Sequence, residues 1–355
     1  MRITRSKKLE KLIPRINART EPRVAAALFQ AARKLPAVRL KKILVTTDFS
    51  KFSMAGLRYA TWLAENLGAS LGLAHVVEPS PTFGGVETSA LARNDLEVVE
   101  LAERETSKLA HRLSKKRTLV RSFVRYGKAF NEIAKLARAR EVDVIVMATH
   151  GYTGLKRIFL GSTAERVVRH APCPVLTIPS RPKAELHRAF ALRLRKILVP
   201  IDFSHTSAQA LPYAAALAET FTAEIILLHV LEPVSMPADS GYMSPPIQPQ
   251  DKNVAQQHLL DLSREVFEDN VRMRVLVRKG LPFSEITEAA NSLDADMIVM
   301  TTHGYTGLAH VLLGSTAERV VRHADCAVLV VRELQGYSRS RRRSESRSRT
   351  SHQRL

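Results

Sequence analysis

Two identical Gly-Ser-Thr triplets, at 161–163 and 314–316, are the part of this chain best suited to hold an anion. Each triplet lies where a loop-like segment turns into a helical pattern. The first turn of a helix has backbone N–H groups without intrahelical partners and a partial positive charge. A glycine there lets a phosphate approach the backbone, and the two hydroxyls add hydrogen-bond donors. The triplets therefore predict phosphate binding.

Helix capping is the alternative explanation of the same residues. Ser162 and Glu165 have the spacing of a capping box, in which the serine hydroxyl and the glutamate carboxylate bind the first free N–H groups. One cap leaves other N–H groups open, so capping and phosphate binding are compatible.

Further polar residues precede each triplet. A His-Gly pair, His150-Gly151 in the first case, is separated from the triplet glycine by nine residues. The histidine is a candidate neighbour of a phosphate rather than a general base, because no carboxylate is fixed beside it in sequence. Asp48 and Asp202 each follow a short apolar run. The alternative for Asp48 is that it caps the following turn together with Ser50.

Structural roles are the alternative for several other candidates. Met147 is either a binding residue or core at a strand end. His75 and His229, inside apolar runs, are expected to be structural histidines with satisfied hydrogen bonds. Both cysteines, Cys173 and Cys326, are expected to be buried thiols.

Common catalytic signatures are absent from the sequence. It has no Gly-x4-Gly-Lys-Ser/Thr loop, no Gly-x-Gly-x-x-Gly, no Cys-x-x-Cys, no His-Glu-x-x-His and no Gly-x-Ser-x-Gly. No nucleophile stands beside an evident base. Lys156 and Arg157 lie in the first spacer, where the second has Ala309 and His310, so a triphosphate is expected to bind the first site more tightly.

An internal repeat explains why every candidate occurs twice. The segment 41–50 returns as 195–204, 149–155 recurs unchanged as 302–308, and 160–171 recurs unchanged as 313–324. The period is one domain length, so the chain is a duplicated domain rather than a solenoid.

Within each copy, short Val/Ile/Leu runs alternate with helical patterns, which predicts a parallel sheet with helices on both faces. The expected fold class is α/β, as two doubly wound, five-stranded, Rossmann-like domains in tandem. Strands are expected at 42–47, 70–77, 118–125, 142–148 and 174–179, and then at 196–201, 224–230, 272–277, 297–301 and 327–331. Helices are expected in the first copy at 53–67, 89–113, 130–140 and 162–170.

Composition separates these domains from the termini. Of the net charge of +20, most lies in residues 1–40, with eleven Lys/Arg against two acids, and in 334–355, with seven Arg against one Glu. We expect a basic N-terminal arm with a short helix at 1–38, domains at 39–181 and 193–333, a linker at 182–192 and a disordered Arg/Ser-rich tail at 334–355. No run reaches the ~18–20 apolar residues of a membrane span, and two cysteines fit a cytoplasmic protein.

The Asp after the first strand, the His-Gly pair, the nine-residue spacer, Gly-Ser-Thr and the ending His170-Ala-Pro-Cys-Pro174 together resemble the universal stress protein family. The resemblance covers 39–179 and 193–332. It implies an adenine-nucleotide-binding α/β fold with a Gly-x2-Gly-x9-Gly-Ser/Thr pattern. Ala148 and Thr301 replace the first glycine of that pattern.

The resemblance also implies roles for individual residues in the binding of ATP or AMP, with or without Mg²⁺. Asp48 and Asp202 lie near the ribose or the metal, beside the backbone-contact positions Thr47 and Ile201. The adenine pocket is lined by Val76 and Val230. The residues expected to flank the nucleotide are Met147, His150, Gly151, Met300, His303 and Gly304, and those expected to hold the phosphates are Gly161, Ser162, Thr163, Gly314, Ser315 and Thr316.

Three hypotheses of function follow. The first is an adenine-nucleotide-binding regulatory protein of the stress response, without essential turnover. The second is a slow ATPase or nucleotidyl-transfer enzyme. The third is a nucleic-acid-associated adaptor that acts through its basic termini, although a solvated, non-specific segment is the preferred explanation of the tail.

The assembly can also be predicted. The fifth strands, at 175–178 and 328–331, are apolar and are expected at the sheet edge, where an uncovered strand is prone to aggregation. The resemblance implies that such edges pair. Two copies on one chain would then form an intramolecular pseudo-dimer, which a homodimer would double.

Overall fold

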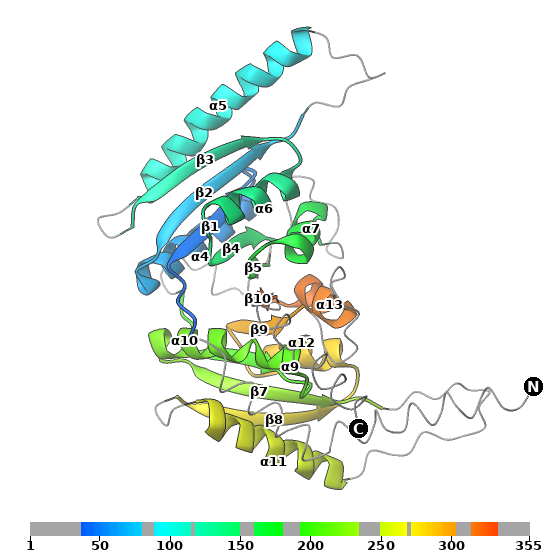
Figure 1. The fold of residues 1–355 in the computed structure, drawn as a ribbon. Helices are drawn as coiled ribbons and strands as arrows, with labels where there is room; N and C mark the ends of the chain where they lie inside the picture. The colour runs from blue at the N-terminus through cyan, green and yellow to red at the C-terminus, as the bar shows by residue number, and fades with distance from the viewer. Residues whose placement is uncertain are drawn as a thin grey trace, which may run out of the picture.

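The computed structural model describes residues 37–79, 89–114, 118–149, 160–179, 192–233, 249–267, 271–302 and 314–332. The first half of the chain alternates strands with helices, as its apolar periodicity predicts (Figure 1). Its elements are β1 (Lys42–Thr47), α4 (Lys51–Leu67), β2 (Ser70–Val77), α5 (Ser89–Leu113), β3 (Val120–Tyr126), α6 (Ala129–Ala139), β4 (Val144–Ala148), α7 (Ser162–His170) and β5 (Val175–Ile178).

The second half repeats this order with one difference in its first helical segment. Pro212 lacks a backbone N–H, so it is poorly tolerated inside a helix. It stands where the first half has Arg58 in the middle of α4, and the equivalent segment is divided into α9 and α10. The elements are β6 (Lys196–Pro200), α9 (His205–Ala208), α10 (Leu211–Phe221), β7 (Glu224–Leu231), α11 (Pro249–Val266), β8 (Met273–Lys279), α12 (Pro282–Ser292), β9 (Met297–Thr301), α13 (Ser315–His323) and β10 (Ala327–Val331).

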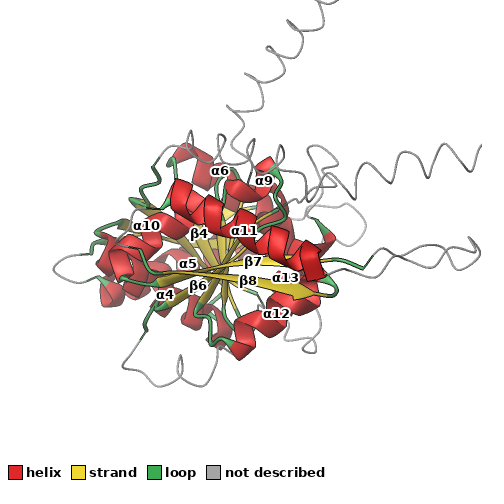
Figure 2. Cartoon of the chain, turned by 90° about the horizontal axis from the view of Figure 1, so that it is seen from below, coloured by secondary structure: helices red, strands yellow, loops and turns green. Residues whose placement is uncertain are grey.

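One ten-stranded sheet runs through both halves, in the order β3-β2-β1-β4-β5-β10-β9-β6-β7-β8. All strands within a half are parallel, and helices lie on both faces of the sheet (Figure 2). In each half the strand order reverses beside the first strand, which has β2 on one side and β4 on the other in the first half. The predicted doubly wound α/β fold is confirmed.

The two halves meet where β5 pairs antiparallel with β10, so the predicted pairing of the fifth strands is confirmed. Leu329 lies opposite Leu176, and both side chains are buried. The ring of Trp62 on α4 stacks on that of Phe221 on α10, with centroids 4.8 Å apart. The guanidinium of Arg332 also donates to the carbonyl of Ala171 across the junction.

Two tyrosines pack reciprocally across this junction. Tyr213 of the second half is buried, and burial raises the pKa of its hydroxyl to about 12, with smaller contributions from Cys173 and Asp143 of the first half. Burial likewise raises the pKa of Tyr59 of the first half, and the negative charge of Asp296 of the second half raises it further. Each half therefore contributes to the environment of the other, about a pseudo-two-fold axis.

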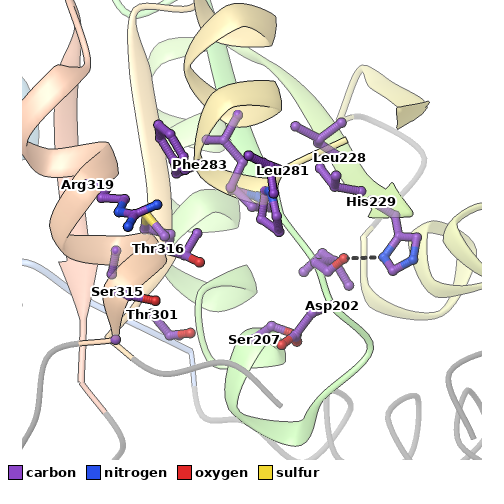
Figure 3. A pocket seen from close by; sticks show the side chains of 18 of the residues that line it. Asp202, Ser207, Leu228, His229, Leu281, Phe283, Thr301, Ser315, Thr316 and Arg319 are labelled. Carbon is purple, nitrogen blue, oxygen red and sulfur yellow. Dashed lines mark hydrogen bonds between the residues drawn. The ribbon is translucent and has the colours of Figure 1, made fainter. Parts of the chain in front are cut away.

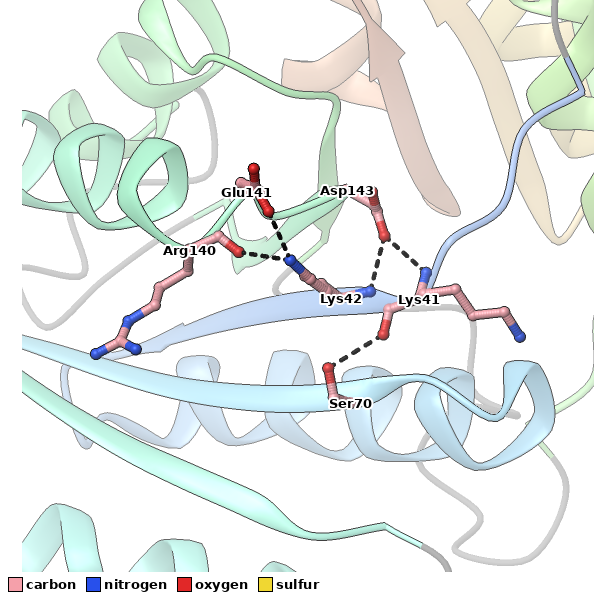
Figure 4. Close-up of polar contacts among 6 residues, drawn as sticks. All are labelled: Lys41, Lys42, Ser70, Arg140, Glu141 and Asp143. Atoms are coloured by element: carbon pink, nitrogen blue, oxygen red, sulfur yellow. Dashed lines mark hydrogen bonds and ion pairs between the residues drawn. The ribbon is translucent and has the colours of Figure 1, made fainter.

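The amino end of the first strand is fixed by a carboxylate. Asp143 accepts hydrogen bonds through Oδ2 from the backbone N–H groups of Lys41, at 2.7 Å, and Lys42, at 2.8 Å (Figure 4). In the second half Asp296 accepts in the same way from the N–H groups of residues 195 and 196. These bonds hold β1 beside β4, and so fix the relative positions of the opposite strand ends, where the candidate site lies.

Differences from the predicted boundaries have local causes. Helix α4 begins at Lys51 rather than Ser53, because the hydroxyl of Ser50 accepts from the N–H of Ser53 and caps the helix. Strand β4 begins at Val144 rather than Val142, because the carboxylate of the preceding residue, Asp143, accepts hydrogen bonds from the backbone at the start of β1. The expected N-terminal helix, the linker and the tail lie outside the described residues.

Candidate nucleotide site

A cavity of about 300 Å³ lies at the carboxyl ends of β1, β2 and β4 and the amino end of α7. All seven described residues predicted for the first site line it, and they come from four separate elements or their ends. They are Thr47, Asp48, Val76, Met147, Gly161, Ser162 and Thr163. The sequence-derived set is therefore brought together in space.

The second half has the same arrangement, with a cavity of about 330 Å³ (Figure 3). Its lining includes all seven described residues predicted for the second site: Ile201, Asp202, Val230, Met300, Gly314, Ser315 and Thr316. The other four predicted residues, His150, Gly151, His303 and Gly304, lie outside the described residues, as do the spacer cations. Their roles stay predictions.

One end of each cavity is formed by a helix without a side-chain cap. Gly161 is the N-cap of α7 and makes no side-chain cap bond, and the same is true of Gly314 and α13. The expected capping box is therefore wrong: Ser162 is the first helical residue, and the carboxylate of Glu165 instead accepts from Arg169 at 2.8 Å. Both helices keep their first N–H groups directed at the cavity end.

The backbone does not require glycine at these two positions. Gly161 has φ −56° and ψ 138°, and Gly314 has φ −60° and ψ 142°, which any residue can adopt. N-cap positions with these angles usually carry Ser, Thr, Asp or Asn. Backbone conformation therefore does not explain the glycine at either position.

A hydrogen bond fixes each helix terminus beside its strand. The N–H of Gly161 donates to the carbonyl of Thr149 at 2.8 Å, and that of Gly314 to Thr302 at 2.8 Å. Thr149 follows β4 directly and donates in turn to Ile178 of β5. The two ends of the segment 150–159 are thus joined, and the Gly-Ser-Thr triplet is held at the carboxyl edge of the sheet.

The aspartates both form a turn and line the cavity, so the turn contact predicted for Asp48 is confirmed and its role beside a nucleotide stays a prediction. Its Oδ1 accepts from the N–H of Ser50 at 3.0 Å, and Oδ1 of Asp202 accepts from that of Ser204 at 3.0 Å. Between them, Phe49 has a left-handed backbone with φ 59°. The equivalent residue 203 has φ 57°. Such a conformation costs about 1 kcal/mol for a residue with a side chain, and here it turns the Asp toward the cavity.

The strand histidines support this strained turn. Nδ1 of His75 lies 2.8 Å from the carbonyl of Thr47, and Nδ1 of His229 lies 2.7 Å from that of Ile201. Because a carbonyl only accepts, Nδ1 is the protonated nitrogen and donates. Each imidazole ring also contacts the adjacent turn phenylalanine, with centroids 4.5 Å apart. The predicted structural role of both histidines is confirmed.

The remaining candidates are buried. Met147 and Met300 are core residues that also line the cavities, with 5% and 6% of their surface exposed. Cys173 and Cys326 are buried free thiols, as expected. Burial raises the pKa of Cys173 to about 12, so it stays a thiol at neutral pH.

Several lining residues were not predicted. Glu78 and Ala129 line the first cavity, and Glu232 and Pro282 hold the same places in the second. Arg319 of α13 lines the second cavity, where its guanidinium lies over a phenylalanine ring at 4.8 Å; Figure 3 shows it directed toward Ser315 and Thr316. Two features of the sequence could have indicated these residues. Glu78 continues the alternation of side chains along β2, and Arg319 lies on the second turn of the helix that follows its triplet.

Two tandem α/β domains that share one sheet, each with a cavity at the carboxyl ends of its strands, define the class of this protein. A family model for the universal stress protein family matches residues 39–179 and 193–332. The chain therefore belongs to the universal stress protein family.

Known relatives agree with this assignment. Universal stress protein MJ0531 of Methanocaldococcus jannaschii is 37% identical over 142 residues, which are 39% of this chain and 82% of that protein. Universal stress protein E of Escherichia coli is 29% identical over 205 residues, 54% of this chain and 60% of its own length. The crystal structure of a universal stress protein from Archaeoglobus fulgidus shares the fold, with a TM-score of 0.59 at 21% identity over 83% of this chain and 97% of that one.

Proposed function

We propose that this universal stress protein is a regulatory protein that binds an adenine nucleotide, ATP or AMP, in each of its two cavities. One observation carries the proposal. The lining of each cavity combines a helix with an N-cap glycine and no side-chain cap, an aspartate, and a group of apolar side chains that form a slot. The strands β2, β1 and β4 are neighbours in this order. The slot lies at β2, the aspartate after β1 and the helix after β4, which is the order of base, ribose and phosphates in a nucleotide.

The residues present fit such a ligand. Val76, Met147 and Ile133 supply an apolar lining for a base, and the α7 terminus supplies N–H donors for phosphates. Within the described ranges, no group of three or more His, Cys, Asp or Glu gathers as a metal site. A Mg²⁺ ion would then be held by the phosphates themselves together with Asp48 or Asp202.

Calorimetry with ATP tests the proposal. We expect two sites per chain, and one site in Gly161→Val and in Gly314→Val, because methyl groups would occupy the space that a phosphate needs. The backbone angles suit valine, but valine is a poorer N-cap than glycine, so the unfolding midpoint should fall modestly without loss of the fold. If both variants keep the parent's affinity and stoichiometry, the assignment of the loops is wrong.

Arg319 leads to a second prediction. Its guanidinium lines the second cavity, so Arg319→Ala should weaken ATP there by about tenfold through loss of a charge-assisted contact. AMP, with fewer phosphate charges, should be affected less. Titration in a Gly161→Val background isolates the second site.

Arg166 is the matched control. It lies over its own phenylalanine at 5.1 Å, but the first cavity's lining does not include it. Arg166→Ala, measured in a Gly314→Val background, should change ATP affinity at the first site less than twofold. Equal losses in the two variants would show that the arginines act only on the packing of their helices.

No helix among the described residues is long and apolar enough to cross a membrane. The cytoplasmic location, the homodimer, slow ATP turnover and nucleic-acid binding stay predictions, and the basic termini that suggested the last of these lie outside the described residues.

A further inference from the structure

One carboxylate stands among the apolar residues at the strand end of the first cavity. Ala74, Val76 and Glu78 alternate along β2 and its continuation, so their side chains leave the same face of the sheet. All three line the cavity, together with Ala129 and Ile133, one turn apart on α6. The result is an apolar slot with a hydrogen-bond acceptor at its rim.

The amino end of α6 holds that acceptor in place. Oε1 of Glu78 accepts from the backbone N–H of Ala129 at 2.8 Å, beside the positive end of the helix dipole. This bond leaves Oε2, for which the described part of the chain offers no partner. A carboxylate accepts and cannot donate, so Oε2 is an acceptor at the solvent-exposed rim of the slot.

From this arrangement we infer that Glu78 selects the base at the first site, by accepting a hydrogen bond from the exocyclic amino group of a 6-aminopurine. The inference rests on the proposed nucleotide function. A 6-oxopurine would place a carbonyl oxygen opposite the carboxylate, so that two acceptors face each other and one loses its hydration without a new bond.

The second half cannot form the same hydrogen bond. Glu232 lines its cavity, but Pro282 replaces Ala129 and has no N–H to donate. Leu281, which is 61% exposed and also lines the cavity, replaces the charged Lys128.

Paired titrations with ATP and inosine triphosphate test the inference, because these ligands differ only in the 6-substituent of the base and in the proton that the 6-oxo form carries on N1. In a Gly314→Val background, which reports the first site, the parent should prefer ATP. Glu78→Gln should reduce the ratio of the two affinities by about tenfold, since an amide can pair with either group. Ala129→Pro, which copies the second half and fits the first turn of α6, should reduce it by a smaller factor.

Glu132 provides the control, because it lies on the same helix and pairs with Lys135 rather than lining the cavity. Glu132→Gln should leave the ratio unchanged. An unchanged ratio in Glu78→Gln, with ATP still bound, overturns this inference and leaves the proposed function standing. Failure of the Gly314→Val parent to bind either nucleotide overturns both.

Discussion

Leu329→Asp should abolish the single folded unit of this protein. Leu329 is 1% exposed and lies opposite Leu176 at the β5–β10 junction, in the middle of the sheet. A carboxylate there would be buried without a partner, which costs several kcal/mol. That cost is comparable with the whole stability of an ordinary domain, about 5–15 kcal/mol. We expect separated halves or aggregated chains, because both apolar edges become exposed.

Light scattering after size exclusion, together with thermal unfolding, measures this effect. Leu329→Ile keeps the volume and the apolar character, and should retain one cooperative transition. Leu119→Asp adds the same charge at a side chain that is 67% exposed, and should be nearly neutral. A Leu329→Asp variant that unfolds in one transition at the parent's midpoint would show that the halves do not depend on their shared junction.

The sequence alone was sufficient for the fold because two signals agreed. Continuous Val/Ile/Leu runs such as Ile43–Val45 alternate with helical patterns, and burial on both faces is what such runs need. Because the domain is repeated, each strand and each site residue was predicted in both copies. Boundaries were less predictable, because they depend on tertiary hydrogen bonds such as those of Asp143, whose acceptor role nothing in the local pattern indicates.

The site was predictable only where chemistry and local pattern coincide. The Gly-Ser-Thr triplets indicate the start of a helix. Whether serine or glycine is the N-cap depends on the residue at which the helix begins, and the capping box was wrong because the helix begins at Ser162. Glu78 and Arg319 were missed because they line the cavities only by virtue of the direction in which their side chains leave the backbone. One continues the alternation of β2, and the other lies on the second turn of α13.

The glycine caps imply a conflict between stability and binding. In this chain Ser50 and Ser204 cap their helices at φ −68° and −78°, close to the −56° of Gly161, and each accepts a bond from the first turn. An aspartate at 161 can therefore make the same bond and add a favourable charge at the helix terminus. We expect Gly161→Asp to raise the free energy of unfolding by about 0.5–1 kcal/mol in the absence of nucleotide.

The same substitution should nearly eliminate nucleotide binding at the first site. The carboxylate would occupy the N–H groups that a phosphate needs and repel its charge, so ATP affinity should fall at least ~100-fold. Gly161→Asp combined with Gly314→Asp should then show no rise in melting temperature with ATP, whereas the parent's rises with ATP concentration. Gly161→Ser and Gly314→Ser separate the two effects, since serine caps without charge and should weaken ATP less. A doubly substituted aspartate variant that ATP stabilises as strongly as the parent would exclude the helix termini as the phosphate site.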